Sequence, residues 1–316
     1  MWRSIIPIAR GSACWAGVRA VADLDLGRLE GPVLAFGGPY GNREATLALL
    51  ARAKELGIGG RNLICTGDVA AYCADPEATA GLLREAGATV VLGNCEQALG
   101  ADAEDCGCGF AAGGRCDTLA AEWYAHCRRA LSAGTRRWMA GLPETARFVL
   151  GGRHFAVVHG APGEIARFVF ASTPQAEKRA AIDRAGAEAV ICGHSGLPFV
   201  QAVGAGLWLN AGAIGMPAND GTPRVWCALL TPRPGGTRVQ LMALDYDWPV
   251  AAARMRAAGL PPAYAETLAT GLWDSCEILP PAERAARGLA LAPTTQDWLD
   301  KAPPVPANSA VPAAAS

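Results

Sequence analysis

Short apolar runs alternate with amphipathic segments along the first third of the chain. Each run ends in glycine and a polar residue, as expected of a buried strand that leads into a tight turn. Between the runs, apolar residues recur at helical spacing, for example at Leu47, Leu50 and Ala51. The pattern predicts strands at 33–36, 62–66 and 89–92 and helices over 43–56 and 76–86. Strands and helices that alternate with short connections predict a mostly parallel α/β sheet.

Residues 95–117 break this rhythm, because they carry cysteine, glycine, aspartate and alanine without periodicity. We interpret them as an excursion over the surface. From about residue 146, short apolar runs separated by Gly/Pro turns predict an antiparallel second sheet. The expected elements are helices over 118–131, 135–141, 174–185, 249–258 and 262–270, and strands at 147–150, 153–158, 189–192, 198–203, 206–210, 225–231 and 238–244. Residues 1–31 are expected to form an N-terminal arm, and the Ala/Pro-rich residues from about 292 are expected to be disordered.

The composition argues against several classes of protein. Of the 316 residues 51% are hydrophobic, which is enough for a large core and excludes a fully disordered chain. The net charge of −1 gives no general attraction for a phosphate backbone, so nucleic acid is not a favoured partner. Charged residues or Gly-Pro breaks interrupt every long apolar run, which argues against a membrane-spanning helix. The 11 cysteines are an odd number in a chain long enough to need no disulfide framework, so a reducing, cytoplasmic location is expected.

Four polar residues share the same position relative to the predicted strands. Asp68, Asn94, His159 and His194 each follow a buried strand and stand next to a glycine. Ligands of open α/β sheets bind at this carboxyl edge of the strands, so we expect the four side chains to converge. A carboxylate, an amide oxygen and two imidazoles suit a borderline divalent ion such as Zn, Mn or Fe better than Ca or Mg.

Glycine-containing blocks surround these four residues and extend beyond them. They read GGPYGN at 37–42, GD at 67–68, GNCE at 93–96, HGAP at 159–162 and GHSG at 193–196, with a glycine-rich stretch at 210–215. In this order they resemble the blocks of the calcineurin-like metallophosphoesterases, in particular a small prokaryotic phosphodiesterase-like branch.

The resemblance covers roughly residues 32–260 and implies a fold, a domain organisation and an activity. The fold would be α/β, with two mixed β-sheets packed as a sandwich flanked by helices. The domain would span 32–275, with a C-terminal extension at 276–316. The activity would be metal-dependent hydrolysis of a phosphomonoester or phosphodiester, with a phosphorylated small molecule as the partner.

The chain departs from the family pattern at four positions. Gly38 and Tyr40 stand where the family has the Asp and His of its first block, Cys95 replaces a histidine, and Gly196 replaces the second histidine of the last block. Carried over residue by residue, the first metal site keeps only Asp68, whereas the second keeps the complete set Asp68, Asn94, His159 and His194. The resemblance therefore implies one divalent transition metal ion, Mn, Fe or Zn, and leaves a second ion in doubt.

Three further residues are candidates for the substrate pocket. Tyr40 either fills the vacated volume with its ring or donates its hydroxyl proton to a ligand oxygen. Asn42 either caps the following helix or contacts phosphate. Cys95 is either a passive thiol or a thiolate ligand. His154 is excluded, because strand alternation points it away from His159, and His126 is expected to be a surface or packing residue.

Cys106 and Cys108 lie in the excursion, separated by one glycine. Their spacing is not that of a structural zinc site, but two such thiols can approach a second metal ion or form a readily reduced disulfide.

Three functions compete at this stage: a divergent metallophosphoesterase with one metal ion, a catalytically silent protein that binds a phosphorylated ligand or a protein partner, and a thiol- or metal-handling protein. The sequence does not decide whether the protein is an enzyme. Cys95 replaces a family histidine, and loss of an acid or electrostatic donor typically lowers a rate by about 10²–10⁴-fold.

Overall fold

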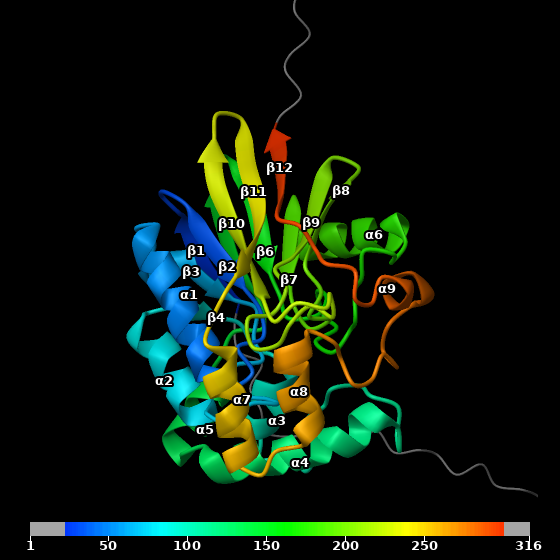
Figure 1. The fold of residues 1–316 in the computed structure, drawn as a ribbon. Helices are drawn as coiled ribbons and strands as arrows, with labels where there is room; N and C mark the ends of the chain where they lie inside the picture. Colours follow the sequence, from blue (N-terminus) through cyan, green and yellow to red (C-terminus); the bar gives the residue numbers. More distant parts are fainter. Residues whose placement is uncertain (1–22, 300–316) are drawn as a thin grey trace, which may run out of the picture.

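The computed structural model describes residues 23–299, which form two six-stranded β-sheets packed face to face with helices outside (Figure 1). One sheet has the order β1-β5-β6-β7-β9-β8, and the other has the order β12-β11-β10-β2-β3-β4. The strands of the first sheet are β1 (Leu24–Arg28), β5 (Ala146–Leu150), β6 (Arg153–Val157), β7 (Ala189–Cys192), β9 (Gly206–Asn210) and β8 (Phe199–Val203). Those of the second are β12 (Thr294–Leu299), β11 (Gly236–Leu244), β10 (Val225–Arg233), β2 (Val33–Phe36), β3 (Leu63–Cys65) and β4 (Thr89–Val90). Both sheets are mixed, which confirms the expected fold class.

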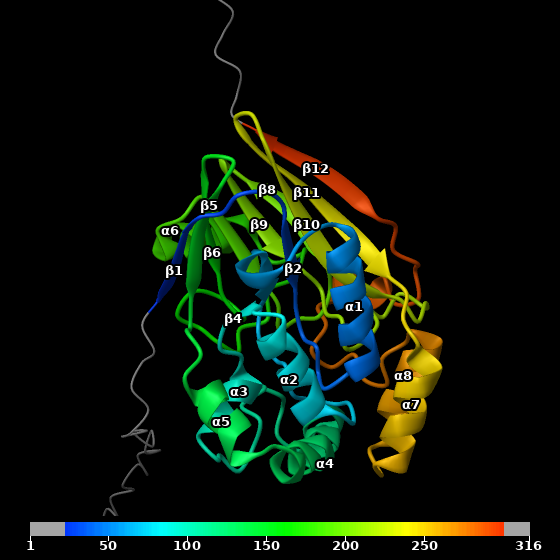
Figure 2. The ribbon, with the colours of Figure 1, turned by 90° about the vertical axis from the view of Figure 1, so that its left-hand side faces the viewer.

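Helices cover the outer faces of the sheets and gather beyond one end of the strands. Helices α1 and α2 flank the second sheet, whereas α3, α4, α5, α7 and α8 lie past the strand ends (Figures 1 and 2). A 3₁₀ turn at Gly60–Asn62 precedes β3. The helices are α1 (Arg43–Glu55), α2 (Pro76–Glu85), α3 (Asn94–Gly100), α4 (Arg115–Ala130), α5 (Ala133–Ala140), α6 (Gln175–Ala185), α7 (Trp248–Ala257), α8 (Pro262–Thr270) and α9 (Pro281–Ala285).

The sandwich core explains why the strands are apolar on both faces. Val33 and Ala35 of β2 face the other sheet, where they join a buried cluster that contains Phe148 and Phe155. Leu34, between them, belongs instead to the cluster under α1 and α2. Strands covered on both faces appear in sequence as continuous hydrophobic runs, the signal used to predict them.

Three expectations about the organisation were wrong. The later strands do not form a separate antiparallel sheet, because β10 pairs with β2 and thereby joins the sheet of the first strands. Part of the expected N-terminal arm is ordered, since Leu24–Arg28 pairs with β5 in parallel. The expected disorder from about 292 does not hold for Thr294–Leu299, which forms an antiparallel ladder with β11. Residues 1–22 and 300–316, which complete the arm and the tail, lie outside the described residues.

The cysteine-rich segment is also more ordered than expected. Its first part, Asn94–Gly100, is helix α3, and α4 begins already at residue 115. The loop between the two helices is largely exposed, but Cys106 and Cys108 are buried and joined by a disulfide. The periodic signal is missing because the inward positions of this loop are set by tertiary contacts rather than by a regular element.

Candidate metal centre

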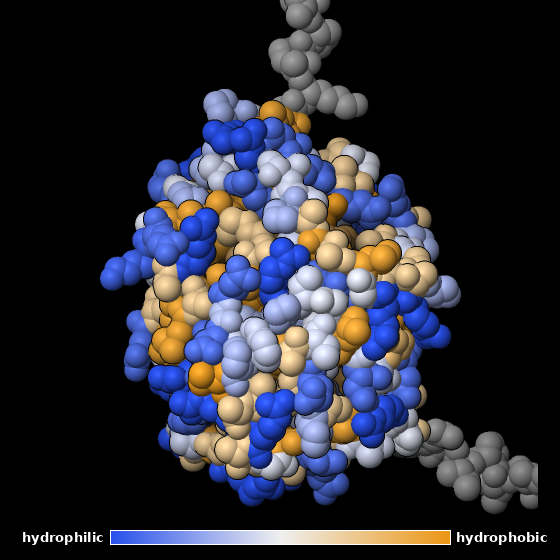
Figure 3. Space-filling model, viewed as in Figure 1, coloured by the Kyte–Doolittle hydropathy of each residue, from blue (hydrophilic) through white to orange (hydrophobic). Residues whose placement is uncertain are grey.

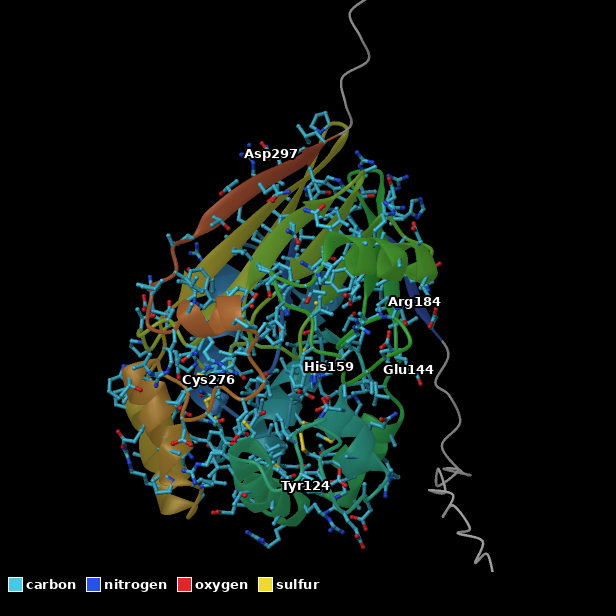
Figure 4. All side chains as sticks on the ribbon, turned by 90° about the vertical axis from the view of Figure 1, so that its right-hand side faces the viewer. Tyr124, Glu144, His159, Arg184, Cys276 and Asp297 are labelled. Atoms are coloured by element: carbon cyan, nitrogen blue, oxygen red, sulfur yellow. A yellow bond between two sulfur atoms is a disulfide. The ribbon has the colours of Figure 1, made fainter. Side chains whose placement is uncertain are left out.

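Asp68, Asn94, His159 and His194 converge at the strand ends that face the helical half of the molecule. Asp68 lies beyond β3, Asn94 begins α3 after β4, and the histidines follow β6 and β7. His159 Nε2 lies 3.0 Å from Asn94 Oδ1, 3.0 Å from His194 Nδ1 and 3.2 Å from Asp68 Oδ2. Figure 4 shows His159 in the interior, below the sheets. The structure thus brings together all four residues that the sequence singled out.

Left-handed backbone conformations direct two of these side chains into the site. Asp68 has φ 57° and His194 has φ 58°, a region that non-glycine residues adopt at a cost of about 1–3 kcal/mol. Such strain persists only where the surrounding structure enforces it, and it is common at binding sites. The adjacent glycines allow close packing, since a Cβ on Gly93 would lie 2.5 Å from Asp68 Oδ1.

Hydrogen bonds behind the site fix which atoms face it. His159 Nδ1 lies 2.6 Å from the Thr66 carbonyl oxygen, which can only accept, so Nδ1 carries a proton and the neutral ring presents its Nε2 lone pair to the site. Asn94 Nδ2 donates to the Cys106 carbonyl oxygen at 2.9 Å, so that Oδ1 points at His159. An imidazole whose second nitrogen donates to a carbonyl is the usual arrangement of a metal-ligating histidine.

The electrostatics of the site depend mainly on burial and on the Asp68 carboxylate. Burial opposes the charged form of both Asp68 and His159, but their mutual attraction outweighs it, lowering the pKa of Asp68 and raising that of His159. Burial, together with the neighbouring His159, lowers the pKa of His194 to about 3, so that His194 is neutral. A carboxylate, an amide oxygen and two imidazole nitrogens that converge in this way suit a borderline divalent cation, which would take the place of the proton that Asp68 otherwise favours on His159.

Glu96 supports the site and was missed by the sequence analysis. Its buried carboxylate accepts hydrogen bonds from the backbone N–H groups of Asp68 at 2.7 Å, Val69 at 2.8 Å and Gly93 at 3.1 Å. Burial and the Asp68 charge raise the pKa of Glu96 to about 7. The signal available in sequence was its place in the GNCE block, three residues after the glycine that precedes α3.

The half of the site that lacks the family ligands is filled by Tyr40. A Cβ on Gly38 would lie 2.2 Å from Cζ of the Tyr40 ring, and a Cβ on Gly196 would lie 3.9 Å from the Tyr40 hydroxyl oxygen. The ring therefore occupies the space that a side chain at Gly38 would need, whereas the atoms nearest to a Cβ on Gly196 belong to Trp273, at 3.5 Å. Of the two roles considered for Tyr40, the structure supports volume filling.

This packing predicts a non-additive effect on stability. We expect Gly38→Ala to destabilise the protein by about 1–3 kcal/mol, because the new methyl group overlaps the Tyr40 ring. In a Tyr40→Ala background the same substitution should cost about 1–2 kcal/mol less, since the backbone strain at Gly38 is common to both backgrounds and cancels in the comparison. Denaturant unfolding of the four proteins measures this difference. Equal costs in the two backgrounds would show that the ring does not fill the space.

Two expected pocket residues do not face the pocket. Asn42 is the N-cap of α1: its Oδ1 accepts from Ala45 N at 3.1 Å, its Nδ2 donates to the Gly215 carbonyl oxygen at 3.0 Å, and the buried side chain does not line the pocket. Cys95 is buried among apolar side chains, and burial raises the pKa of its thiol well above the ordinary value, which disfavours a thiolate. Its backbone N–H donates to Asp68 Oδ1 at 3.3 Å, and its thiol sulfur lies 3.6 Å from Asn94 Nδ2, so Cys95 packs behind two of the site residues.

The remaining candidates also have defined places. The disulfide of Cys106 and Cys108 lies against the site, with Cys108 Sγ 3.3 Å from Asn94 Nδ2 (Figure 4). The sequence left two roles open for this pair, binding of a second metal ion or formation of a disulfide. In the structure the two cysteines are joined by a disulfide. His154 is exposed on β6, and His126 packs with Nε2 2.9 Å from the Ala74 carbonyl oxygen, so both lie outside the site as expected.

The comparisons with known proteins agree with this architecture. Residues 41–232, more than half of the chain, match the calcineurin-like phosphoesterase superfamily domain, and the chain therefore belongs to that superfamily. A metallophosphoesterase from Sphaerobacter thermophilus has a similar structure, with a TM-score of 0.59 and 22% identity over 76% of this chain and 99% of that one. A hypothetical protein from Pyrococcus horikoshii OT3 is also similar, with a TM-score of 0.66 and 17% identity over 77% and 99%. A comparison with curated proteins found no match.

Proposed function

We propose that the protein is a metal-dependent phosphoesterase that hydrolyses a phosphomonoester or phosphodiester with a single Mn, Fe or Zn ion held by Asp68, Asn94, His159 and His194. The observation that carries this proposal is the convergence of the four side chains, with three ligand atoms within 3.2 Å of His159 Nε2. Membership of the superfamily supports the reaction class.

The residues around the proposed ion would orient its ligands and shield them from water. A bound divalent ion would supply Lewis acidity to a phosphoryl oxygen and to water. Thr66 holds the His159 ring through Nδ1, and Cys106 holds the Asn94 amide through Nδ2, so the ligand atoms are oriented before an ion binds. Phe168 stacks on His194 with ring centroids 4.2 Å apart, which shields that ligand from water on one side.

Two observations favour the catalytically silent protein as a second candidate. The Tyr40 ring packs over Gly38, so a second ion, which two-metal hydrolysis needs for a shared hydroxide, would find no side-chain ligand at that position. Within residues 23–299, the pocket beside the site has no lysine or arginine among its lining residues to neutralise a transferring phosphoryl group.

Hydrolysis of bis(4-nitrophenyl) phosphate with Mn²⁺ present separates the two candidates. The proposed enzyme should lose at least about 100-fold in rate on Asp68→Ala, because the ion that polarises the phosphate is lost. Asp183→Ala, which removes a surface carboxylate of α6 that pairs with Arg179, is the matched control and should keep the wild-type rate. Equal rates for wild type and Asp68→Ala would contradict the phosphoesterase proposal and favour the catalytically silent binding protein.

The third candidate, a thiol- or metal-handling protein, makes a different prediction. We expect the double variant Cys106→Ser, Cys108→Ser to keep the wild-type metal content, because disulfide sulfurs are not thiolate ligands and the shorter contact to Asn94 Nδ2, at 2.9 Å, comes from the Cys106 backbone carbonyl rather than from Cys108 Sγ at 3.3 Å. Elemental analysis of both proteins, each purified without added metal, tests this. A lower metal content in the variant would show that the sulfurs bind an ion.

A cytoplasmic location is proposed on the basis of the cysteines. Eight of the described cysteines are free thiols, which is typical of a reducing compartment. Across residues 23–299, no helix combines the length and hydrophobicity needed to cross a membrane. On the face seen in Figure 3, apolar residues are interspersed with polar ones over the described surface.

A further inference from the structure

A pocket rich in aromatic side chains opens directly from the proposed metal site. Asp68 and His194 form one end of its wall. The rest of the wall is dominated by six aromatic residues, Tyr40, Tyr72, Phe110, Phe168, Tyr264 and Trp273, with Met216, Pro217 and Ile278 between them. None of the aromatic residues beyond Tyr40 was a candidate in the sequence, because they come from loops and helices that only the fold brings together.

Contacts among these rings hold the wall in place. Tyr72 packs between Tyr40, at a centroid distance of 4.8 Å, and Tyr264, at 5.0 Å. Trp273 is anchored by its indole N–H, which donates to the Pro217 carbonyl oxygen at 2.8 Å. Phe168 is stacked on His194. A rigid aromatic wall binds a flat apolar group at low entropic cost, because few side chains must be ordered on binding.

Three polar side chains of the wall are already used within the protein. Ser195 Oγ donates to the Val169 carbonyl oxygen at 2.9 Å, and Thr267 Oγ1 donates to the Ala263 carbonyl oxygen at 3.0 Å. Asp274 pairs with Arg115 at 2.7 Å. Apart from the hydroxyls of Tyr40 and Tyr72, the wall therefore offers a sugar or a second phosphate few groups to replace the water that it would lose, which is unfavourable.

The charged groups around the pocket also limit which ligands it can bind. In the described part of the chain, its lining includes no lysine and no arginine. A divalent ion together with the Asp68 carboxylate gives one net positive charge at that end, and the Glu96 carboxylate faces backbone N–H groups rather than the pocket. One positive charge balances a phosphodiester monoanion but not a polyphosphate, whose additional charges would stay unpaired.

We propose that the pocket selects a phosphodiester that carries one negative charge and an aryl or similarly flat apolar group, and that it discriminates against polyphosphates and sugar phosphates. The phosphate would sit at the Asp68 and His194 end, and the flat group would lie between Trp273 and Tyr264. The placement of the phosphate rests on the proposed function, whereas the preference for a flat group rests on the aromatic wall alone.

Calorimetric titration of the Mn²⁺-treated protein tests the inference with non-reacting probes. We expect diphenyl phosphate to bind at least about tenfold more tightly than dimethyl phosphate, in line with the energy of one aromatic stacking contact, and more tightly than pyrophosphate. Trp273→Ala should weaken diphenyl phosphate about tenfold and leave dimethyl phosphate unchanged. Trp248→Ala is the matched control, because this half-buried tryptophan of α7 lies outside the pocket wall.

The outcomes separate this inference from the proposed function. Equal affinities for the two diesters, a Trp273→Ala effect that is the same for both, or tighter binding of pyrophosphate would overturn it. A preference for diphenyl phosphate that disappears in Trp273→Ala supports it, even in a preparation that holds no metal and shows no hydrolysis. A metal-free, inactive preparation with this preference would contradict the proposed phosphoesterase function but support the proposed selectivity of the aromatic wall.

Discussion

Replacing His159 with alanine is expected to lower the affinity for a divalent metal ion by more than about 100-fold. Even partners that only orient a metal ligand are worth about 10–100-fold in affinity, and His159 Nε2 is the atom on which the other three side chains converge. Because an ion that binds only the folded state stabilises it, excess Mn²⁺ should raise the melting temperature of the wild type and not that of the variant.

His154→Ala is the matched control for this prediction. It removes a histidine from the same strand region, but one that is exposed on β6 and outside the site. The control should bind metal and respond to Mn²⁺ as the wild type does. Wild-type metal affinity in His159→Ala would show that the four side chains are not the ligands of an ion.

Replacing Glu96 with alanine should produce the largest loss of stability among the residues around the site. The substitution leaves the N–H groups of Asp68, Val69 and Gly93 buried without an acceptor. Each unsatisfied buried donor costs about 1–3 kcal/mol, so the free energy of unfolding should fall by at least about 3 kcal/mol. Glu96→Gln, which keeps one acceptor oxygen, should cost less and still fold.

Denaturant unfolding and metal titration of Glu96→Gln together test the positioning role. The metal affinity should fall, because fewer hydrogen bonds then hold the loop that carries Asp68 at the start of α3. The control Glu55→Gln changes an exposed carboxylate that pairs only with Arg52 on the surface, and its stability should stay within about 0.5 kcal/mol of wild type. Unchanged stability and metal affinity in Glu96→Gln would contradict the role assigned to this carboxylate.

The convergence of Asp68, Asn94, His159 and His194 could be predicted from sequence because its signals are local. Each ligand follows a continuous apolar run and stands beside a glycine, and the strand-end rule brings such positions together without knowledge of side-chain contacts. The order of the glycine-containing blocks indicated the family, and Gly38 and Gly196 stand where the family has two of its ligands. The structure adds that Tyr40 fills that half.

The aromatic pocket could not be predicted in the same way. Tyr72, Phe168 and Trp273 lie in loops, where no periodicity shows which side chains turn inward. Glu96 resembled an ordinary first-turn acid of a helix, and only the fold shows that its carboxylate reaches the loop of Asp68. The strand Thr294–Leu299 was missed because its burial is limited to one side chain, Trp298, that reaches the core.

The cysteine-rich segment contributes to the site through a contact that its sequence does not reveal. Its sequence suggested thiol chemistry, but the contact that matters most at the site is a backbone one, from the Cys106 carbonyl oxygen to Asn94 Nδ2. This bond leaves Asn94 Oδ1 free for an ion. The disulfide restrains the turn from which that carbonyl comes.

The number of metal ions per chain tests the central claim most directly. The protein is equilibrated with excess Mn²⁺, freed of unbound metal by gel filtration, and measured by elemental analysis against protein concentration. One retained set of four ligands predicts about one ion per chain, with none in His159→Ala. A ratio near zero in the wild type would contradict a retained site, and a ratio near two would contradict the replacement of the second site by the Tyr40 ring.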